Sequence, residues 1–112
     1  MDIVFGSTKL EKELNDTSLL RRRHGARRAQ LIRRRLDELY AADTLAVLRS
    51  LPAARCHELK GDRAGQLSVD LDHPYRLIFK PSNNPIPKKP DGGLDWTRVT
   101  VVMIIGVEDT HE

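Results

Sequence analysis

The sequence contains one cysteine, one tryptophan, two tyrosines, two phenylalanines and no long apolar run, and each shortage excludes a class of protein. Cys56 cannot form an intramolecular disulfide and offers no metal-ligand spacing, so we expect neither a disulfide framework nor a zinc site. No stretch approaches the roughly 18 apolar residues of a membrane span, and the first ten residues lack the pattern of a signal peptide. We therefore expect a cytoplasmic protein with no membrane partner.

Charge, by contrast, is abundant and unevenly placed. Charged residues make up 31% of the chain, and the formal net charge is +3. A polar helix face is most simply a solvated surface, but adjacent like charges repel unless an anion or an acidic surface neutralises them. Arginine suits phosphate and carboxylate groups because its planar guanidinium forms two parallel hydrogen bonds with them. We expect such a partner for the arginine-rich stretch, which contains Arg21, Arg22, Arg23, Arg27, Arg28, Arg33, Arg34 and Arg35.

The first half of the chain has the apolar spacing of amphipathic helices. Residues 8 to 11 have the spacing of a capping box, so a first helix is expected to begin at Thr8. Apolar residues three and four apart predict a longer helix over residues 25 to 43. A short third helix is expected behind Asp43, ending before Pro52.

In the second half the apolar period changes to two, which indicates strands. Alternation predicts strands over residues 66 to 72 and 75 to 80, joined by a link short enough for a hairpin. Residues 98 to 107 predict a last strand that is apolar on both faces from Val101 to Ile105, as in a central strand. The proline-rich stretch 81 to 97 reads as a long exposed loop. The order of elements predicts one α+β domain over residues 1 to 112, with N-terminal helices on one face of a small, mostly antiparallel sheet. The other face is then free for function.

Three short motifs carry most of the ionisable chemistry of this half. They are CHELKGDR at residues 56 to 63, PYRLIF at 74 to 79 and IIGVEDTHE at 104 to 112. Together they resemble the RelE/ParE superfamily of bacterial type II toxins, specifically its HigB-like, plasmid-maintenance branch, and the similarity covers most of the chain. The resemblance implies a RelE-like fold and ribosome-dependent cleavage of messenger RNA in the ribosomal A site. It also implies a HigA-like helix-turn-helix antitoxin, through which alone the protein would contact operator DNA.

Carried over by position, the resemblance assigns the site to residues in all three motifs. It points to His57, Lys60, Arg76, Asp109 and His111. By spacing alone, each histidine has the simpler interpretation of a structural or surface residue. Position 110 departs from the family pattern, because this chain has Thr110 where better known HigB toxins carry tyrosine, which argues against a stacking or proton-transfer role there.

These residue types suit RNA cleavage by internal attack of a 2′-hydroxyl. The reaction needs a base for the hydroxyl proton, positive charge on the phosphate and an acid for the leaving 5′ oxygen. Histidine serves at either end near neutral pH, and Lys60 and Arg76 can hold the phosphate. Asp109 can orient His111 or take the proton itself. The scheme requires no metal ion or other cofactor.

Binding of the substrate is expected to depend on the ribosome. Arg63 and the arginine-rich stretch would contact ribosomal RNA through its phosphates, while the few aromatic residues offer little stacking surface for free RNA. Two alternatives remain open. One is a ParE-like toxin that inhibits DNA gyrase and needs neither His57 nor His111, and the other is an inactive homologue that serves only as the antitoxin's partner.

Overall fold

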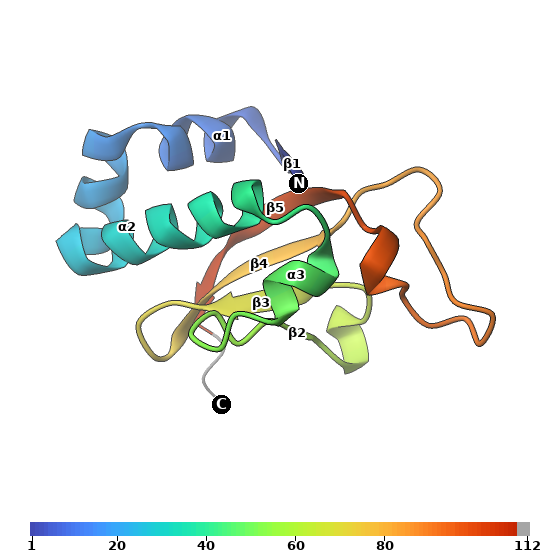
Figure 1. The fold of residues 1–112 in the computed structure, drawn as a ribbon. Helices are drawn as coiled ribbons and strands as arrows, with labels where there is room; N and C mark the ends of the chain where they lie inside the picture. Colours follow the sequence, from blue (N-terminus) through green and yellow to red (C-terminus); the bar gives the residue numbers. More distant parts are fainter. Residues whose placement is uncertain (110–112) are drawn as a thin grey trace.

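The computed structural model describes residues 1–109, so the predictions for Thr110 and His111 fall outside the described residues. It contains helices packed on a five-stranded sheet (Figure 1). The helices are α1 (Thr8–Asn15), α2 (Thr17–Ala41) and α3 (Leu45–Arg49), with the 3-10 helices η1 (Gly61–Arg63) and η2 (Trp96–Arg98). The strands are β1 (Asp2–Phe5), β2 (His57–Glu58), β3 (Leu67–Asp70), β4 (Tyr75–Pro81) and β5 (Val101–Asp109).

The sheet is mixed but mostly antiparallel. Its strand order is β1-β5-β4-β3-β2, in which β1 and β5 run parallel and the other neighbouring strands run antiparallel. β5 pairs with both β1 and β4, so the prediction of a central last strand is confirmed. β3 and β4 form the predicted hairpin, whose register places Asp70 opposite Arg76.

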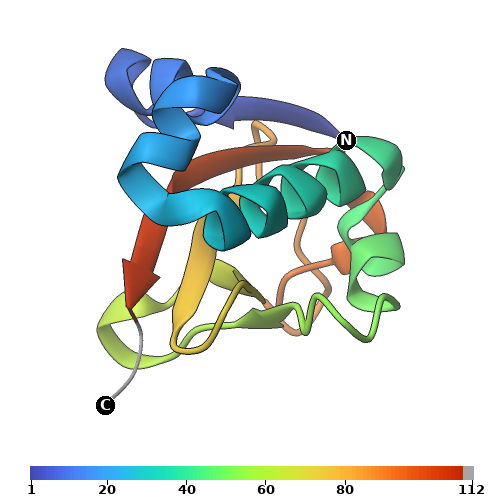
Figure 2. The same cartoon turned by 90° about the vertical axis from the view of Figure 1, so that its left-hand side faces the viewer.

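The helices pack on one face of the sheet, which confirms the predicted α+β class. Figures 1 and 2 show α2 running along that face. Ile32 and Leu36 of α2 are fully buried in one apolar cluster with Leu77 and Phe79 of β4. Burial of large aliphatic and aromatic side chains of this kind contributes roughly 1.5 to 3 kcal/mol each.

The first helix begins at Thr8, as predicted, but the N-cap residues of α1 and α3 each differ by one position from the predicted ones. Ser7, not Thr8, is the N-cap of α1, because its side chain accepts a backbone hydrogen bond from the residue three positions on. Thr44, not Asp43, is the N-cap of α3. The predicted helix start at Gly25 is instead a kink inside α2. Gly25 adopts a φ of 80° there, a backbone conformation that is unfavourable for residues with a side chain. The kink turns the chain between the two halves of α2 (Figure 1).

The sheet face away from the helices bears polar side chains near one end, but the side chains at its centre are buried. Side chains alternate along a strand, so Asp70 and Arg76 project from this face. Ser68 and Ile78 project from it too, yet both are completely buried. The expected free face is therefore covered at its centre, and its open part next to His57 is the region around Asp70 and Arg76.

A bulge in β5 changes which residues share a face. The register with β4 shifts between Ile78 and Phe79, and Ile105 is the extra residue on β5. Ile104, before the bulge, is buried toward the helices, and Val107, beyond it, packs against the same core. The alternation of β5 is therefore reversed at its C-terminal end.

Residues 82 to 100 form the long connection between β4 and β5, close to the predicted loop. The segment is bonded within itself, since Lys88 bridges to Leu94 and the side chain of Asn83 accepts from the backbone of Thr100. Trp96 ties it to the sheet, because its indole nitrogen donates to Glu58 at 3.0 Å. Within residues 1–109, no helix has both the length and the apolar character needed to cross a bilayer.

Candidate functional site

His57 and Arg76 meet on the sheet face away from the helices. β2 pairs with β3 so that His57 lies opposite Ser68, and the Nε2 atom of His57 lies 3.3 Å from Nη1 of Arg76. The other ring nitrogen, Nδ1, lies 3.0 Å from the carbonyl oxygen of Arg55. A carbonyl only accepts hydrogen bonds, so Nδ1 carries the hydrogen and Nε2 presents its lone pair to the guanidinium.

Two residues that sequence reasoning missed complete this cluster. The carboxylate of Asp70 lies 3.4 Å from Nε of Arg76 and 3.5 Å from Nε of Arg55. The predicted hairpin carried a signal for Asp70, because its register sets that residue opposite Arg76. No sequence signal marks Arg55, whose place depends on a backbone φ of 47°. The cluster joins two guanidinium groups to one carboxylate and one imidazole, an excess of positive charge that suits an anion.

Lys60 and Arg63 lie at the two ends of η1. Lys60 is exposed. Arg63 differs from the expectation of a phosphate ligand, because its guanidinium donates to both carboxylate oxygens of Glu108 at 2.8 and 2.7 Å and to Gln66 at 2.8 Å. The hydrogen bond to Glu108 raises the pKa of Arg63. This pair ties the turn that carries Lys60 to the end of β5.

Asp109 does not share a face with Arg76. The register places Asp109 opposite Tyr75, which packs toward the helices, and places Glu108 opposite Arg76. The acidic side chain of β5 on the polar face is therefore Glu108, which sequence reasoning missed. His111 lies outside the described residues.

Cys56 precedes His57 but faces the interior. It is 8% exposed, and burial raises the pKa of its thiol to about 12. A thiol with such a pKa stays protonated at neutral pH, so Cys56 is no nucleophile. Among residues 1–109, no group of three or more His, Cys, Asp or Glu side chains is arranged to hold a metal ion.

The arginine-rich stretch divides into paired and unpaired side chains. Arg23 pairs with Glu13 and Arg33 with Asp37, each at 3.2 Å. Four other arginines of the stretch are exposed and form no ion pair within residues 1–109. We call them the basic surface: Arg21, Arg22, Arg27 and Arg34.

Arg35 contradicts the expectation that this stretch faces an external anion throughout. It is only 5% exposed, and its guanidinium donates to the carbonyl oxygens of Asp70 at 2.7 Å and Ala53 at 3.1 Å and to the carboxylate of Glu38 at 2.9 Å. A buried guanidinium needs such partners, because an unpaired buried charge is costly. Arg35 therefore fixes the backbone beneath the His57 cluster.

Arg28 also has a structural role. Its guanidinium makes two hydrogen bonds of 2.9 and 3.1 Å to Asp72 and lies 3.4 Å from the ring centroid of Tyr75. The hydrogen bond between Arg28 and Asp72 raises the pKa of Arg28 and holds the pKa of Asp72 below its usual value. Arg28 thus clamps α2 onto the β3–β4 turn.

The lowered pKa of Asp72 predicts acid-sensitive stability. An acid with a depressed folded-state pKa stabilises the fold above its unfolded-state pKa, about 3.9, and loses that contribution as the pH falls through the folded value. Asp72→Asn should lower the free energy of unfolding by about 1 kcal/mol at pH 7. The difference in the free energy of unfolding between Asp72→Asn and the unsubstituted protein should narrow in urea titrations as the pH falls below about 3.9. Asp37→Asn, which removes an exposed helix pair, should change the free energy of unfolding little. A deficit for Asp72→Asn that stays constant with pH would contradict the assignment.

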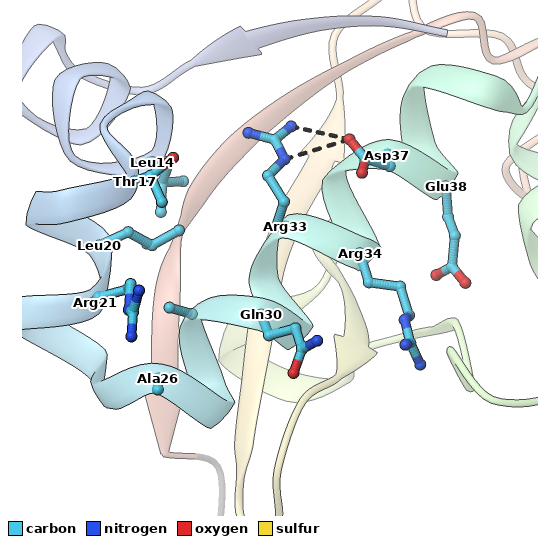
Figure 3. Close-up of a pocket in the computed structure, with 11 residues that line it drawn as sticks. Leu14, Thr17, Leu20, Arg21, Ala26, Gln30, Arg33, Arg34, Asp37 and Glu38 are labelled. Carbon is cyan, nitrogen blue, oxygen red and sulfur yellow. Dashed lines mark hydrogen bonds and ion pairs between the residues drawn. The ribbon is translucent and has the colours of Figure 1, made fainter.

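A groove of about 750 Å³ lies between the two halves of α2 and the end of α1 (Figure 3). Three apolar residues that line it, Leu14, Leu20 and Ala29, are at most 4% exposed. Arg21 and Arg34 of the basic surface line it. The groove lies in the helix layer, whereas the His57 cluster lies on the opposite face of the sheet.

Comparison with known proteins matches the chain to a family and a fold. The model of the HigB-like toxin family, described as RelE-like toxin of type II toxin-antitoxin system HigB, matches residues 5–89. The match includes His57, Lys60 and Arg76 and ends before β5. The structure is similar to that of a YoeB/ParE toxin from Agrobacterium tumefaciens, with a TM-score of 0.59 and 14% identity, covering 99% of this chain and 100% of that chain. At this identity the likeness shows the fold alone, and no curated protein sequence gives a significant match.

Proposed function

Because this chain belongs to the HigB-like toxin family of type II toxin-antitoxin systems, we propose that it is a ribosome-dependent endoribonuclease that cuts messenger RNA in the ribosomal A site. The family gives it a toxin role and a protein antitoxin as partner. We propose further that this antitoxin is a HigA-like helix-turn-helix protein. Operator DNA would then be bound only through the antitoxin, and the toxin would act in the cytoplasm.

The observation that carries this proposal is the contact between His57 and Arg76. A guanidinium and an imidazole with an available lone pair, on one exposed face, supply the phosphate ligand and the base that the reaction needs. Both residues lie inside the region matched to the toxin family. A reaction at this site would account for the ionisable side chains that follow Cys56 in the motif at residues 56 to 63.

The proposed step is an internal transfer of the phosphoryl group. The 2′-oxygen forms a bond to the adjacent phosphorus as the bond from phosphorus to the 5′ oxygen breaks, which leaves a 2′,3′-cyclic phosphate and a 5′-hydroxyl. Arg76 turns from His57 to the phosphate, which frees the lone pair of Nε2 to take the 2′-hydroxyl proton. Lys60 is exposed next to the start of η1, where its positive charge would stabilise the negative charge of the phosphate in the transition state. No metal ion is required in this scheme.

The acid for the leaving 5′ oxygen is proposed to be His111. Asp109 is the last described residue of β5, and His111 lies two positions further along the sequence. Since Asp109 lies on the face toward the helices, its proposed role is to fix the direction of the tail and not to bind the substrate phosphate.

Ribosome binding is proposed to use the basic surface on α2. Its four exposed arginines lie on the helix layer, away from His57, so the protein would contact ribosomal RNA and messenger RNA with different faces. Arg63, bound to Glu108, would contribute to this binding only by exchanging its carboxylate partner for a phosphate.

The proposal is tested by offering the purified protein a messenger RNA with and without programmed ribosomes. We expect cleavage on the ribosome and little cleavage of free RNA, because the ribosome holds the substrate strand in place. Intact messenger RNA in both reactions, together with inhibition of gyrase supercoiling, would instead favour the gyrase inhibitor. Intact RNA and active gyrase, with antitoxin bound, would favour the inactive homologue.

A further inference from the structure

We propose that Arg55 and Asp70 are positioning residues that hold His57 and Arg76 ready for the reaction, an inference that rests on the proposed function. The four side chains and one backbone carbonyl form a closed ring of contacts. His57 contacts Arg76, Arg76 contacts Asp70, Asp70 contacts Arg55, and the carbonyl of Arg55 returns to His57.

The backbone of Arg55 sets the tautomer of His57. Arg55 is the one non-glycine residue within 1–109 with a positive φ, at 47°. Such a conformation is unfavourable for an L residue and persists where the surroundings enforce it, often at functional sites. Here it directs the Arg55 carbonyl to Nδ1 of His57 at 3.0 Å. The hydrogen therefore stays on Nδ1, and Nε2 remains the basic nitrogen.

The segment leading into Arg55 is fixed from two sides. The backbone N–H of Asp70 donates to the carbonyl of Ala54 at 2.7 Å, and Ala54 is completely buried. Arg35 donates to the carbonyl of Ala53 at 3.1 Å and to that of Asp70 at 2.7 Å. Arg55 thus follows directly on the buried residue Ala54, in a segment whose two carbonyl groups are both hydrogen-bonded, which offers a way to maintain its unusual backbone.

The side chain of Asp70 orients the two arginines. One carboxylate oxygen lies 3.4 Å from Nε of Arg76, and the other lies 3.5 Å from Nε of Arg55. The first oxygen is buried and makes no hydrogen bond within residues 1–109, so it holds Arg76 by charge at ion-pair distance. An interaction of this kind directs the guanidinium toward His57 yet yields readily to a phosphate, whose oxygens can accept direct hydrogen bonds.

Matched substitutions at Arg55 separate its backbone from its side chain. Arg55→Asn and Arg55→Val both remove the guanidinium, but asparagine tolerates a positive φ and a β-branched residue does not. Asp70→Asn keeps the shape of the side chain and removes its charge. Thermal unfolding of each variant checks that it is folded.

The first readout is independent of cleavage. Long-range ¹H–¹⁵N correlation spectra of the neutral imidazole show which ring nitrogen of His57 carries the hydrogen. We expect Nδ1–H in the unsubstituted protein and in Arg55→Asn, and a mixture of tautomers in Arg55→Val. Nδ1–H in Arg55→Val, or Nε2–H in the unsubstituted protein, would overturn the inference even if the protein proves not to be a ribonuclease.

The second readout is single-turnover cleavage on the ribosome. We expect Arg55→Val and Asp70→Asn to slow cleavage by roughly 10-fold to 100-fold with ribosome affinity nearly unchanged, and Arg55→Asn to slow it less. Asp70→Asn in the Arg55→Asn background should cost less than it does alone, because the two residues act through one ring. Full cleavage rates in folded Arg55→Val and Asp70→Asn would contradict positioning, whereas absence of cleavage in the unsubstituted protein would count against the proposed function alone.

Discussion

His57→Gln should lower the single-turnover rate of messenger RNA cleavage on the ribosome by roughly 10²-fold to 10⁴-fold, while ribosome affinity stays within a few fold. Glutamine can still form a hydrogen bond at this position, but it cannot take a proton from the 2′-hydroxyl. Since His57 is exposed and contacts Arg76 from the short edge strand β2, its replacement should leave the core intact. The measurement is quench-flow cleavage with the protein in excess over programmed ribosomes.

The control for this prediction is His24→Gln. His24 lies on α2 and pairs with Glu13 at 3.4 Å, in the helix layer and away from the sheet face that bears His57. Its replacement should leave the cleavage rate unchanged. His111→Gln should match the loss expected for His57→Gln if His111 is the acid. A His57→Gln protein that cleaves at the full rate would remove the site assignment.

Replacing the four arginines of the basic surface by glutamine should weaken ribosome binding and flatten its dependence on salt. Each arginine that binds a phosphate should contribute about 0.7 to 0.9 to the slope of log affinity against log salt. If all four bind phosphates, their replacement should therefore reduce the slope by roughly three units. The measurement is ribosome co-sedimentation over a range of potassium concentrations with the variant in which Arg21, Arg22, Arg27 and Arg34 are glutamine.

Two paired arginines provide the matched control for the basic surface. Arg23 and Arg33 lie on the same helix, but Glu13 and Asp37 already neutralise them. Replacing these two by glutamine should reduce the slope less per residue than replacing members of the basic surface. An unchanged slope in the four-residue variant would show that the basic surface is a solvated face or an antitoxin contact.

Periodicity predicted the elements whose buried faces follow a local pattern of apolar residues. The apolar run of β5 indicated a central strand, and the short link after β3 indicated a hairpin, because both follow from local patterns of burial and turn length. Periodicity did not identify Gly25 as a kink inside α2. Helical spacing continues on both sides of that residue, and only its φ of 80° separates the two halves.

The site was predicted less well because it depends on contacts between distant segments. Uninterrupted alternation from Ile104 along β5 would place Asp109 on the polar face beside Arg76, but the extra residue Ile105 reverses the alternation and places Glu108 there instead. In the sequence nothing distinguishes Arg35 from the neighbouring arginines Arg33 and Arg34, which lie closer to the surface. Arg35 is buried because the β3 backbone and the segment before β2 present carbonyl groups to it.

The most direct test of the proposed ribonuclease is primer extension on a translated messenger RNA after the protein is induced without antitoxin. New 5′ ends are expected within codons of the reading frame, and they should disappear when the start codon is removed and when His57→Gln is induced instead. Growth arrest with intact transcripts and gyrase-linked DNA breaks would contradict the proposed function.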